Sequence, residues 1–248
     1  MLRQMEALEK FKIIGKDGEV GELDDFFFDD GEWTVRELVI RSGDWLSGSR
    51  VLILPHSVIA IDTEQKAIAV SLTRQQIEEA PAPPGESEEL LGRYYEALLY
   101  EYYAFPFYWL GPEVWGYTWH PNGVPIDAMD PKEAEQMARL RESRSARLRS
   151  FNIVNGFSIA CVDGSLGDVE DMIFDDENWT IQYIVVDTRK FLPSKNVLVP
   201  PRAVQEVAWQ DATIRLDMKK ADLKALPSFQ SLDDVPAGSD MVAVGRAA

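Results

Sequence analysis

The sequence predicts a mainly β protein in which two small β-barrels are joined by a partly helical, aromatic-rich insert. Three observations lead to this prediction: a long internal repeat, short apolar runs within each copy, and a change of composition between the copies. The segment Asp17–Val58 returns without a gap as Asp163–Val204, shifted by 163 − 17 = 146 positions. This period is far longer than the roughly 20 to 50 residues of solenoid repeats, so each copy is expected to be a whole domain with its own core.

Within each copy, short apolar runs alternate with turn residues at close spacing, which is typical of a small barrel or sandwich. In the first copy the predicted strands are Phe11–Ile14, Val20–Phe28, Trp33–Ile40, Arg50–Leu54, Ser57–Asp62 and Ala67–Leu72. The Asp-Gly pairs at 17–18 and 163–164 predict type I′ hairpin turns, in which both central residues have positive φ. The acidic segments 29–32 and 175–178 predict the next turn, because short polar side chains bond local backbone amides.

Each copy is expected to close with a short helix. In the first copy, Thr73 and Gln76 have the spacing of a capping box, and Pro81 marks the end of the helix. In the second copy, the segment 222–226 precedes Pro227 at the same offset. The repeat therefore extends beyond the segment of closest identity.

The insert between the copies has a different character. Pro81–Gly85 predicts a stiff linker, and Ser87 is suited to cap a helix whose apolar residues, spaced by four, continue to Tyr102. An irregular loop rich in Trp, Tyr, Gly and Pro follows. Asp130 then predicts the start of a second helix, which ends in a basic stretch that suits the helix dipole. The predicted domain boundaries are residues 1–80, 81–150 and 151–229, with a flexible tail at 230–248.

Composition excludes some classes of function. With 25 basic and 42 acidic residues the net charge is −17, which repels nucleic acid and anionic lipid. No apolar run reaches the roughly 18 residues of a membrane span, and the N-terminus carries no signal peptide. A cytoplasmic location is therefore expected. Cys161 is expected to be a buried apolar residue, and His56 a surface polar residue.

The sequence motifs do not support a catalytic function. The acidic pairs Asp24-Asp25 with Asp29-Asp30, and Asp171 with Asp175-Asp176, are candidate ligands for Ca²⁺ or Mg²⁺, but turn chemistry explains them as well. No Gly-x-Ser-x-Gly elbow, dinucleotide fingerprint or Walker motif occurs. We therefore expect a protein that is not an enzyme and that holds neither a metal nor a cofactor.

The order of motifs in the second copy resembles the PRC-barrel domain. These motifs are Asp-Gly-x-x-Gly-x-x-x-Asp from Asp163, an Asp-Asp turn before an aromatic residue, Tyr183–Asp187 and Lys195–Pro201. The family includes the cytoplasmic part of the photosynthetic reaction-centre H subunit and a ribosome maturation factor. This chain differs from both of these proteins. Unlike the H subunit it shows no N-terminal membrane helix, and unlike the maturation factor it joins one barrel to a second barrel. Their specific functions therefore do not transfer, and the resemblance implies the fold and a binding role.

The aromatic residues of the insert exceed what a small barrel needs, and three interpretations compete: packing between the barrels, a subunit interface, or a ligand or membrane contact. The function predicted is a protein-binding or scaffolding module that forms homo-oligomers. Alternatives are a membrane-associated adaptor of an electron-transfer complex and a metal-dependent enzyme that uses the paired aspartates. The candidate interface residues are Tyr94, Tyr95, Leu98, Tyr102, Phe107, Trp109, Trp115 and Trp119.

Overall fold

The computed structural model describes residues 1–43, 50–82, 93–111, 113–123, 148–188 and 195–236. The chain divides into two compact units. We call Ala7–Phe151 with Glu177–Trp179 the N-terminal unit, and Met1–Glu6 with Asn152–Asp176 and the chain from Thr180 onward the C-terminal unit. Each unit contains one copy of the repeat and a short segment from another part of the chain.

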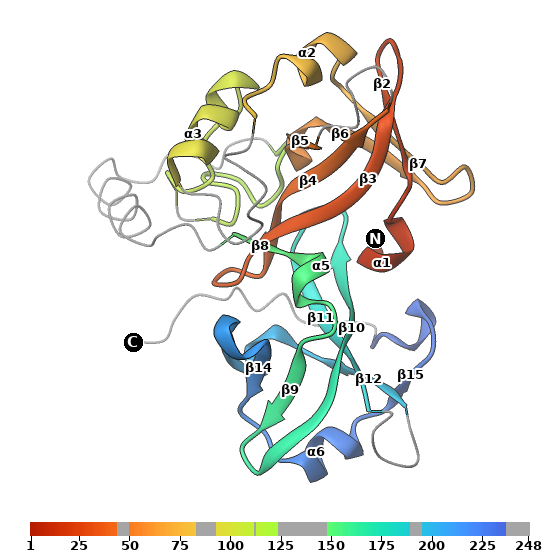
Figure 1. Cartoon of the computed structure of the whole chain (residues 1–248), viewed down its shortest axis with the longest axis vertical. Helices are drawn as coiled ribbons and strands as arrows, with labels where there is room; N and C mark the ends of the chain where they lie inside the picture. Colours follow the sequence, from red (N-terminus) through yellow and green to blue (C-terminus); the bar gives the residue numbers. More distant parts are fainter. Residues whose placement is uncertain (44–49, 83–92, 112, 124–147, 189–194, 237–248) are drawn as a thin grey trace. The chain divides into compact units, whose positions relative to one another are not determined.

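The N-terminal unit is built on one sheet, drawn in red to orange in Figure 1. The strands lie in the order β5-β4-β3-β2-β7-β6, and the short strand β8 pairs with β3. All pairs are antiparallel except the parallel pair β2 and β7. The bounds, close to the predicted runs, are β2 Lys12–Gly15, β3 Gly18–Asp29, β4 Thr34–Ser42, β5 Arg50–Ile53, β6 Val58–Asp62, β7 Ala67–Val70 and β8 Leu148–Ser150.

The C-terminal unit repeats this arrangement. Its strands lie in the order β13-β14-β9-β10-β11-β12-β15, and β1 pairs with β10. The parallel pair is β9 with β14. The bounds are β1 Leu2–Gln4, β9 Ser158–Cys161, β10 Gly164–Asp175, β11 Ile181–Asp187, β12 Asn196–Val199, β13 Val204–Ala208, β14 Thr213–Leu216 and β15 Ser228–Phe229.

The sequence predicts closed barrels, and here the structure differs. Among the described residues, the first and last strands of each sheet are not paired with each other, so each sheet is open. In the N-terminal unit, β5 ends at a 3₁₀ turn, Pro55–Ser57, and β6 then pairs with β7. Proline lacks the N–H that a continued strand pairing needs, so the chain leaves the sheet at this point.

The predicted Asp-Gly hairpins form in both units, but not with type I′ geometry. The two turn residues lie one position earlier than predicted, at 16–17 and 162–163, and the glycines are the first residues of β3 and β10. Of each Asp-Gly pair only the glycine has positive φ, 127° at Gly18 and 119° at Gly164. The aspartate instead accepts a hydrogen bond from the start of the closing helix. Asp17 Oδ1 lies 2.9 Å from the backbone N of Arg74, and Asp163 Oδ1 lies 2.8 Å from that of Lys220. The aspartate is therefore held by a helix that lies 57 residues further along the chain.

A second pair of glycines permits a close approach of backbones. A Cβ at Gly21 would lie 2.2 Å from the carbonyl oxygen of Arg41, and one at Gly167 would lie 2.3 Å from that of Asp187. Both distances are far below contact, so only glycine fits. The four positions correspond at the offset of 146.

Short helices accompany the sheets: α1 Met5–Leu8, α2 Arg74–Glu78, α3 Arg93–Tyr102, α5 Phe151–Val154 and α6 Lys220–Ala225. The capping box predicted at Thr73 and Gln76 is present at α2. A 3₁₀ turn at Leu232–Asp234, capped by Ser231, lies within the predicted tail. The helix predicted from Asp130 and the tail beyond residue 236 lie outside the described residues. Within the described residues, no helix has the length and apolarity needed to cross a membrane.

Candidate functional site: charged residues beneath helix α3

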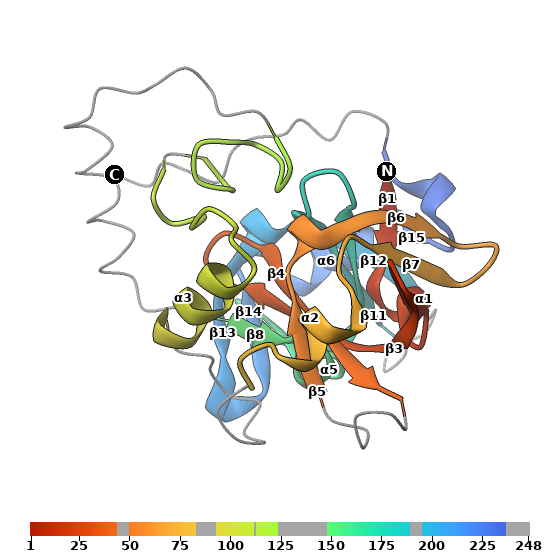
Figure 2. The ribbon, with the colours of Figure 1, turned by 90° about the horizontal axis from the view of Figure 1, so that it is seen from above.

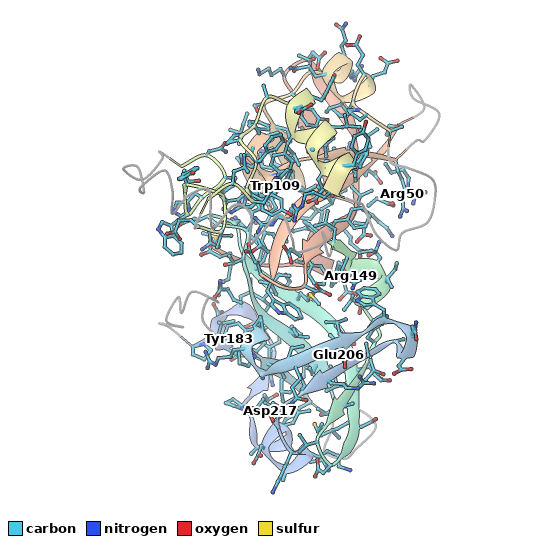
Figure 3. The ribbon with its side chains drawn as sticks, turned by 90° about the vertical axis from the view of Figure 1, so that its left-hand side faces the viewer. Arg50, Trp109, Arg149, Tyr183, Glu206 and Asp217 are labelled. Carbon is cyan, nitrogen blue, oxygen red and sulfur yellow. The ribbon has the colours of Figure 1, made fainter. Side chains whose placement is uncertain are left out.

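Helix α3 lies against the N-terminal sheet through a layer of charged and aromatic side chains. It is the yellow helix in Figures 1 and 2, and Trp109 of the loop that follows it is labelled beside it in Figure 3. The hydroxyl of Tyr103, just beyond the helix, donates to the carbonyl oxygen of Leu52 on β5 at 3.1 Å. We call the side chains of Arg36, Glu37, His56, Arg93, Glu96 and Tyr108 in this layer the buried charge cluster.

Arg36 is the sheet's contribution to the cluster. Its side chain is fully buried, a rare position for an arginine that therefore requires partners. Its guanidinium forms an ion pair with Glu32 at 2.6 Å and donates to the carbonyl oxygen of Val114 at 2.7 Å. It also lies over the ring of Tyr108, 3.7 Å from the centroid, as in a cation–π contact. The arginine thus joins strand β4 to the loop after α3.

Arg93, Glu96 and Tyr108 form a second group on the helix side. The Tyr108 hydroxyl donates to Glu96 at 2.8 Å and accepts from Arg93 at 2.8 Å. Arg93 also lies 3.2 Å from Glu96, and its guanidinium stacks over the ring of Trp109. Because the groups are removed from water, each of these bonds contributes more than its exposed counterpart would.

Glu37 has no such partners. Its side chain is fully buried, and neither carboxyl oxygen has a hydrogen-bond partner among the residues that the structure describes. Burial raises its pKa well above the usual value, and the nearby carboxylate of Glu96 raises it further, against the opposing charges of Arg93 and Arg36. Both arginines already pair with another carboxylate, Glu32 or Glu96. Burial therefore favours the protonated, neutral form of Glu37.

His56 is buried, and the expectation of a surface position is wrong. Its ring stacks on Phe105 with centroids 4.7 Å apart and meets the edge of Trp115 at 5.0 Å. Burial, followed by the positive charge of Arg36, lowers its pKa to about 3. The imidazole is therefore neutral at physiological pH. Sequence comparison of the copies missed this because the counterpart Arg202 is exposed.

The structure separates the predicted interface residues into two groups. Tyr95, Trp109 and Trp115 are buried in the N-terminal unit, where the Trp115 indole donates to the carbonyl oxygen of Asn178 at 2.7 Å. Phe107 is partly buried and stacks on Trp109. The exposed members are Tyr94, Leu98, Tyr102 and Trp119.

The paired aspartates contact donors of the protein. Asp24 binds Arg41 and Arg50 at 2.6 and 2.8 Å. Asp29 Oδ1 accepts from the backbone N of Gly31 at 2.8 Å, the predicted turn contact. Asp30 pairs with Arg149 at 3.0 Å. Within the part of the chain that the structure describes, no cluster of three or more His, Cys, Asp and Glu is arranged to hold a metal ion.

Two of these aspartates are buried and bind a segment from elsewhere in the chain. Asp25 accepts from the Ser150 hydroxyl of β8 at 2.5 Å. Asp171, in the other unit, accepts from the Gln4 side chain of β1 at 3.0 Å. Burial raises the pKa of Asp171 to about 6, although its three hydrogen-bond donors act in the opposite direction. Cys161 is a buried free cysteine, as predicted, and burial raises the pKa of its thiol.

The buried charge cluster belongs to the first copy of the repeat. At the offset of 146, Arg36 corresponds to Gln182 and Glu37 to Tyr183. Two adjacent charges before the apolar run Leu38–Ile40, replaced by uncharged residues in the other copy, are the signal by which sequence comparison could have found the site. Most of the cluster is buried, while the side chain of Arg93 is 23% exposed. Its contacts connect α3 to β4 through Tyr108.

Comparison with known proteins identifies one domain. Residues 159–223 match the model of the PRC-barrel domain. This match lies in the C-terminal unit, except for Glu177–Trp179, and falls on the copy that carries the resemblance most clearly. No curated protein matches the chain.

Proposed function

We propose that this protein is a non-enzymatic binding or scaffolding module with two PRC-barrel-type repeats, and that it forms homo-oligomers through the outer face of α3. We define this face by Tyr94, Leu98 and Tyr102, which lie one helical turn apart. The observation that carries the proposal is their exposure: Tyr94 is 79% exposed, Leu98 37% and Tyr102 36%. Apolar and aromatic residues held in this way on one helix face are typical of interface centres.

The buried charge cluster supports the proposal from the opposite side of the helix. Glu96, Leu99 and Tyr100 are buried on the inner face. A helix fixed in this way presents its outer residues in one arrangement, so that association costs little further ordering. The Tyr102 hydroxyl adds to this by donating to the carbonyl oxygen of Gln76 at α2.

The family match supports the choice of a binding role. We include the first copy in the proposal because it is related to the second by the internal repeat. Asp17 and Asp163 make corresponding contacts in the two copies. A second copy of the chain is proposed as partner because Tyr94, Leu98 and Tyr102 form an exposed patch of aromatic and apolar side chains, with Glu101 as its charged neighbour on α3. Closed, symmetric association of identical surfaces is the commonest form of oligomer.

The proposal is tested by the double variant Tyr94→Ser/Leu98→Ser. The wild type is expected to have a mass that is a multiple of 28.0 kDa in light scattering, and the variant the mass of a folded monomer. The matched control is Ile59→Ser on β6, which removes a side chain that is 66% exposed at a different site. The control should keep the oligomer. A monomeric wild type, or a double variant with unchanged mass, would refute the proposed interface.

A further inference from the structure

The two longest strands that the structure describes are β3 and β10. Each pairs along its final residues with a strand from outside its own copy of the repeat. The first half of β3 pairs with β2, while its end, Phe27–Asp29, pairs with β8. The first half of β10 likewise pairs with β9, while Ile173–Asp175 pairs with β1. In each unit the added strand comes from the segment that precedes the other copy of the repeat. Both units therefore contain a site for an added strand.

The two sites recognise their strands by the same contacts. In the C-terminal unit, Arg3 Nε binds Asp176 at 2.7 Å and Gln4 Nε2 binds Asp171 at 3.0 Å. In the N-terminal unit, Arg149 Nε binds Asp30 at 3.0 Å and Ser150 Oγ binds Asp25 at 2.5 Å. The strands share the sequence Leu-Arg followed by a polar and an apolar residue, in 2–5 and 148–151. Charge-assisted bonds of this kind give specificity in addition to the backbone pairing.

The two strands differ in how deeply they are held. In β8, Leu148 and Ser150 are buried. In β1 all three residues are only partly buried, and Leu2 packs at the margin of a cluster formed by Ile173, Val185 and Phe229. The residue that follows each strand, Met5 or Phe151, is fully buried. The three residues of β1 are thus less buried than those of β8, and segments with less burial open more readily. Opening of β1 would make its site on β10 available.

We propose that the edge of β10 occupied by β1 is a strand-addition site that takes residues Leu2–Glu6 of a second copy of this chain. The specificity arises from Asp176, which binds the arginine, and Asp171, which binds the glutamine side chain and the backbone N–H of Glu6 at 3.1 Å. The incoming copy would make the contacts that the chain's own strand makes, as in domain swapping. This inference uses a different surface from the outer face of α3 and does not depend on it.

The first experiment uses the labelled peptide MLRQMEALEK, which is residues 1–10, as a probe for the full-length chain. In the wild type, the chain's own strand competes with the peptide. Arg3→Glu places a negative charge beside Asp176, releases that strand and leaves the site intact. By fluorescence anisotropy, this variant should bind the peptide at least tenfold more tightly than the wild type. Adding Asp176→Ala to it should remove most of the gain.

The matched control is Arg41→Glu, the same change at an exposed arginine that pairs with Asp24 in the other unit. It should bind the peptide no better than the wild type. Near-ultraviolet circular dichroism checks that each variant is folded, and the milder variant Gln4→Ala replaces Arg3→Glu if that chain does not fold. Equal peptide binding by the wild type, the opened variant and the control would overturn the site.

The second experiment tests the second copy as the source of the strand. Arg3→Glu offers an open site, and Asp176→Ala offers an intact strand that its own site holds weakly. All chains carry Tyr94→Ser/Leu98→Ser, so that association through α3 does not contribute. The mixture should contain a one-to-one complex by native mass spectrometry, while each chain alone should not dimerise. Peptide binding without this complex would overturn a second copy as the occupant.

Discussion

Glu37 shows how a single residue can link the stability of this protein to pH. Its counterpart in the other repeat is Tyr183, so the strand position accepts a side chain without charge. Arg36 pairs with Glu32, and Arg93 pairs with Glu96. An ionised Glu37 would add a negative charge to the interior with no hydrogen-bond donor beside it among the described residues, so burial favours the protonated carboxyl.

We predict that Glu37→Gln stabilises the protein at high pH and leaves it nearly unchanged at low pH. The pKa of Glu37 is raised in the folded state, so its favourable effect is complete below the unfolded-state pKa of about 4.3 and is lost as pH rises. Above that value each pH unit costs the wild type about 1.4 kcal/mol until the folded-state pKa is reached. Because a glutamine side chain does not titrate, the variant does not lose this stability as the pH rises.

The measurement is urea denaturation of both proteins between pH 5 and pH 8. The free energy of unfolding of Glu37→Gln minus that of the wild type should increase with pH. Glu64→Gln, an exposed change of the same chemistry, should show no such trend. A difference independent of pH would mean that Glu37 is ionised in the folded state.

At the scale of the element, α3 is a helix with two different faces. Its inner face is held by buried groups, and its outer face carries Tyr94, Leu98 and Tyr102. The short helix has no stability of its own in water, because isolated helices below roughly 12 residues are marginal. The contacts of the inner face, together with those of Tyr108, therefore decide whether the outer face is presented at all.

We predict that Tyr108→Phe destabilises the protein by about 1 to 3 kcal/mol. The variant keeps the ring beneath Arg36 but removes the hydroxyl that binds Arg93 and Glu96, and it leaves buried charged groups with one partner fewer. Urea denaturation provides the measurement. Tyr94→Phe, which removes an exposed hydroxyl from α3, should change the free energy of unfolding by less than about 0.5 kcal/mol. Equal effects would show that the buried charge cluster does not hold α3.

At the scale of the whole molecule, acidic residues outnumber basic ones by 17, yet the acidic pairs singled out by sequence are engaged with donors of the protein. Asp24 binds two arginines, Asp30 binds Arg149, and Asp25 and Asp171 bind the added strands. A cation at these sites would have to displace these contacts.

We therefore predict that the thermal unfolding midpoint is the same in EDTA and in millimolar Ca²⁺ or Mg²⁺. A ligand that binds only the folded state must raise the apparent stability, so differential scanning calorimetry detects such a site without knowledge of its position. A midpoint that rises with the concentration of one cation would instead support the metal-dependent alternative. An equal concentration of Na⁺ salt controls for screening of the net charge.

Much of the fold can be read from the chain because it depends on local pattern. The alternation of apolar runs and turn residues located β2 to β7 of the N-terminal unit, and the capping residues located α2, whereas β1, β8 and β15 were not predicted. Gly21 and Gly167 recur at the same offset because a close backbone approach at each admits no side chain. The burial of Cys161 follows from the apolar residues that surround it in the sequence.

Other features depend on contacts between residues far apart in the chain, and only the folded structure decides them. The raised pKa of Glu37 arises from its burial and from the nearby Glu96 of α3, and the burial of His56 arises from rings that follow α3. The pairing of β1 with β10, and of β8 with β3, depends on the part of each long strand that β9 or β2 leaves unpaired. The pattern of apolar and turn residues does not predict this pairing. Burial and pairing are properties of the surroundings of a residue, and those surroundings exist only once the chain has folded.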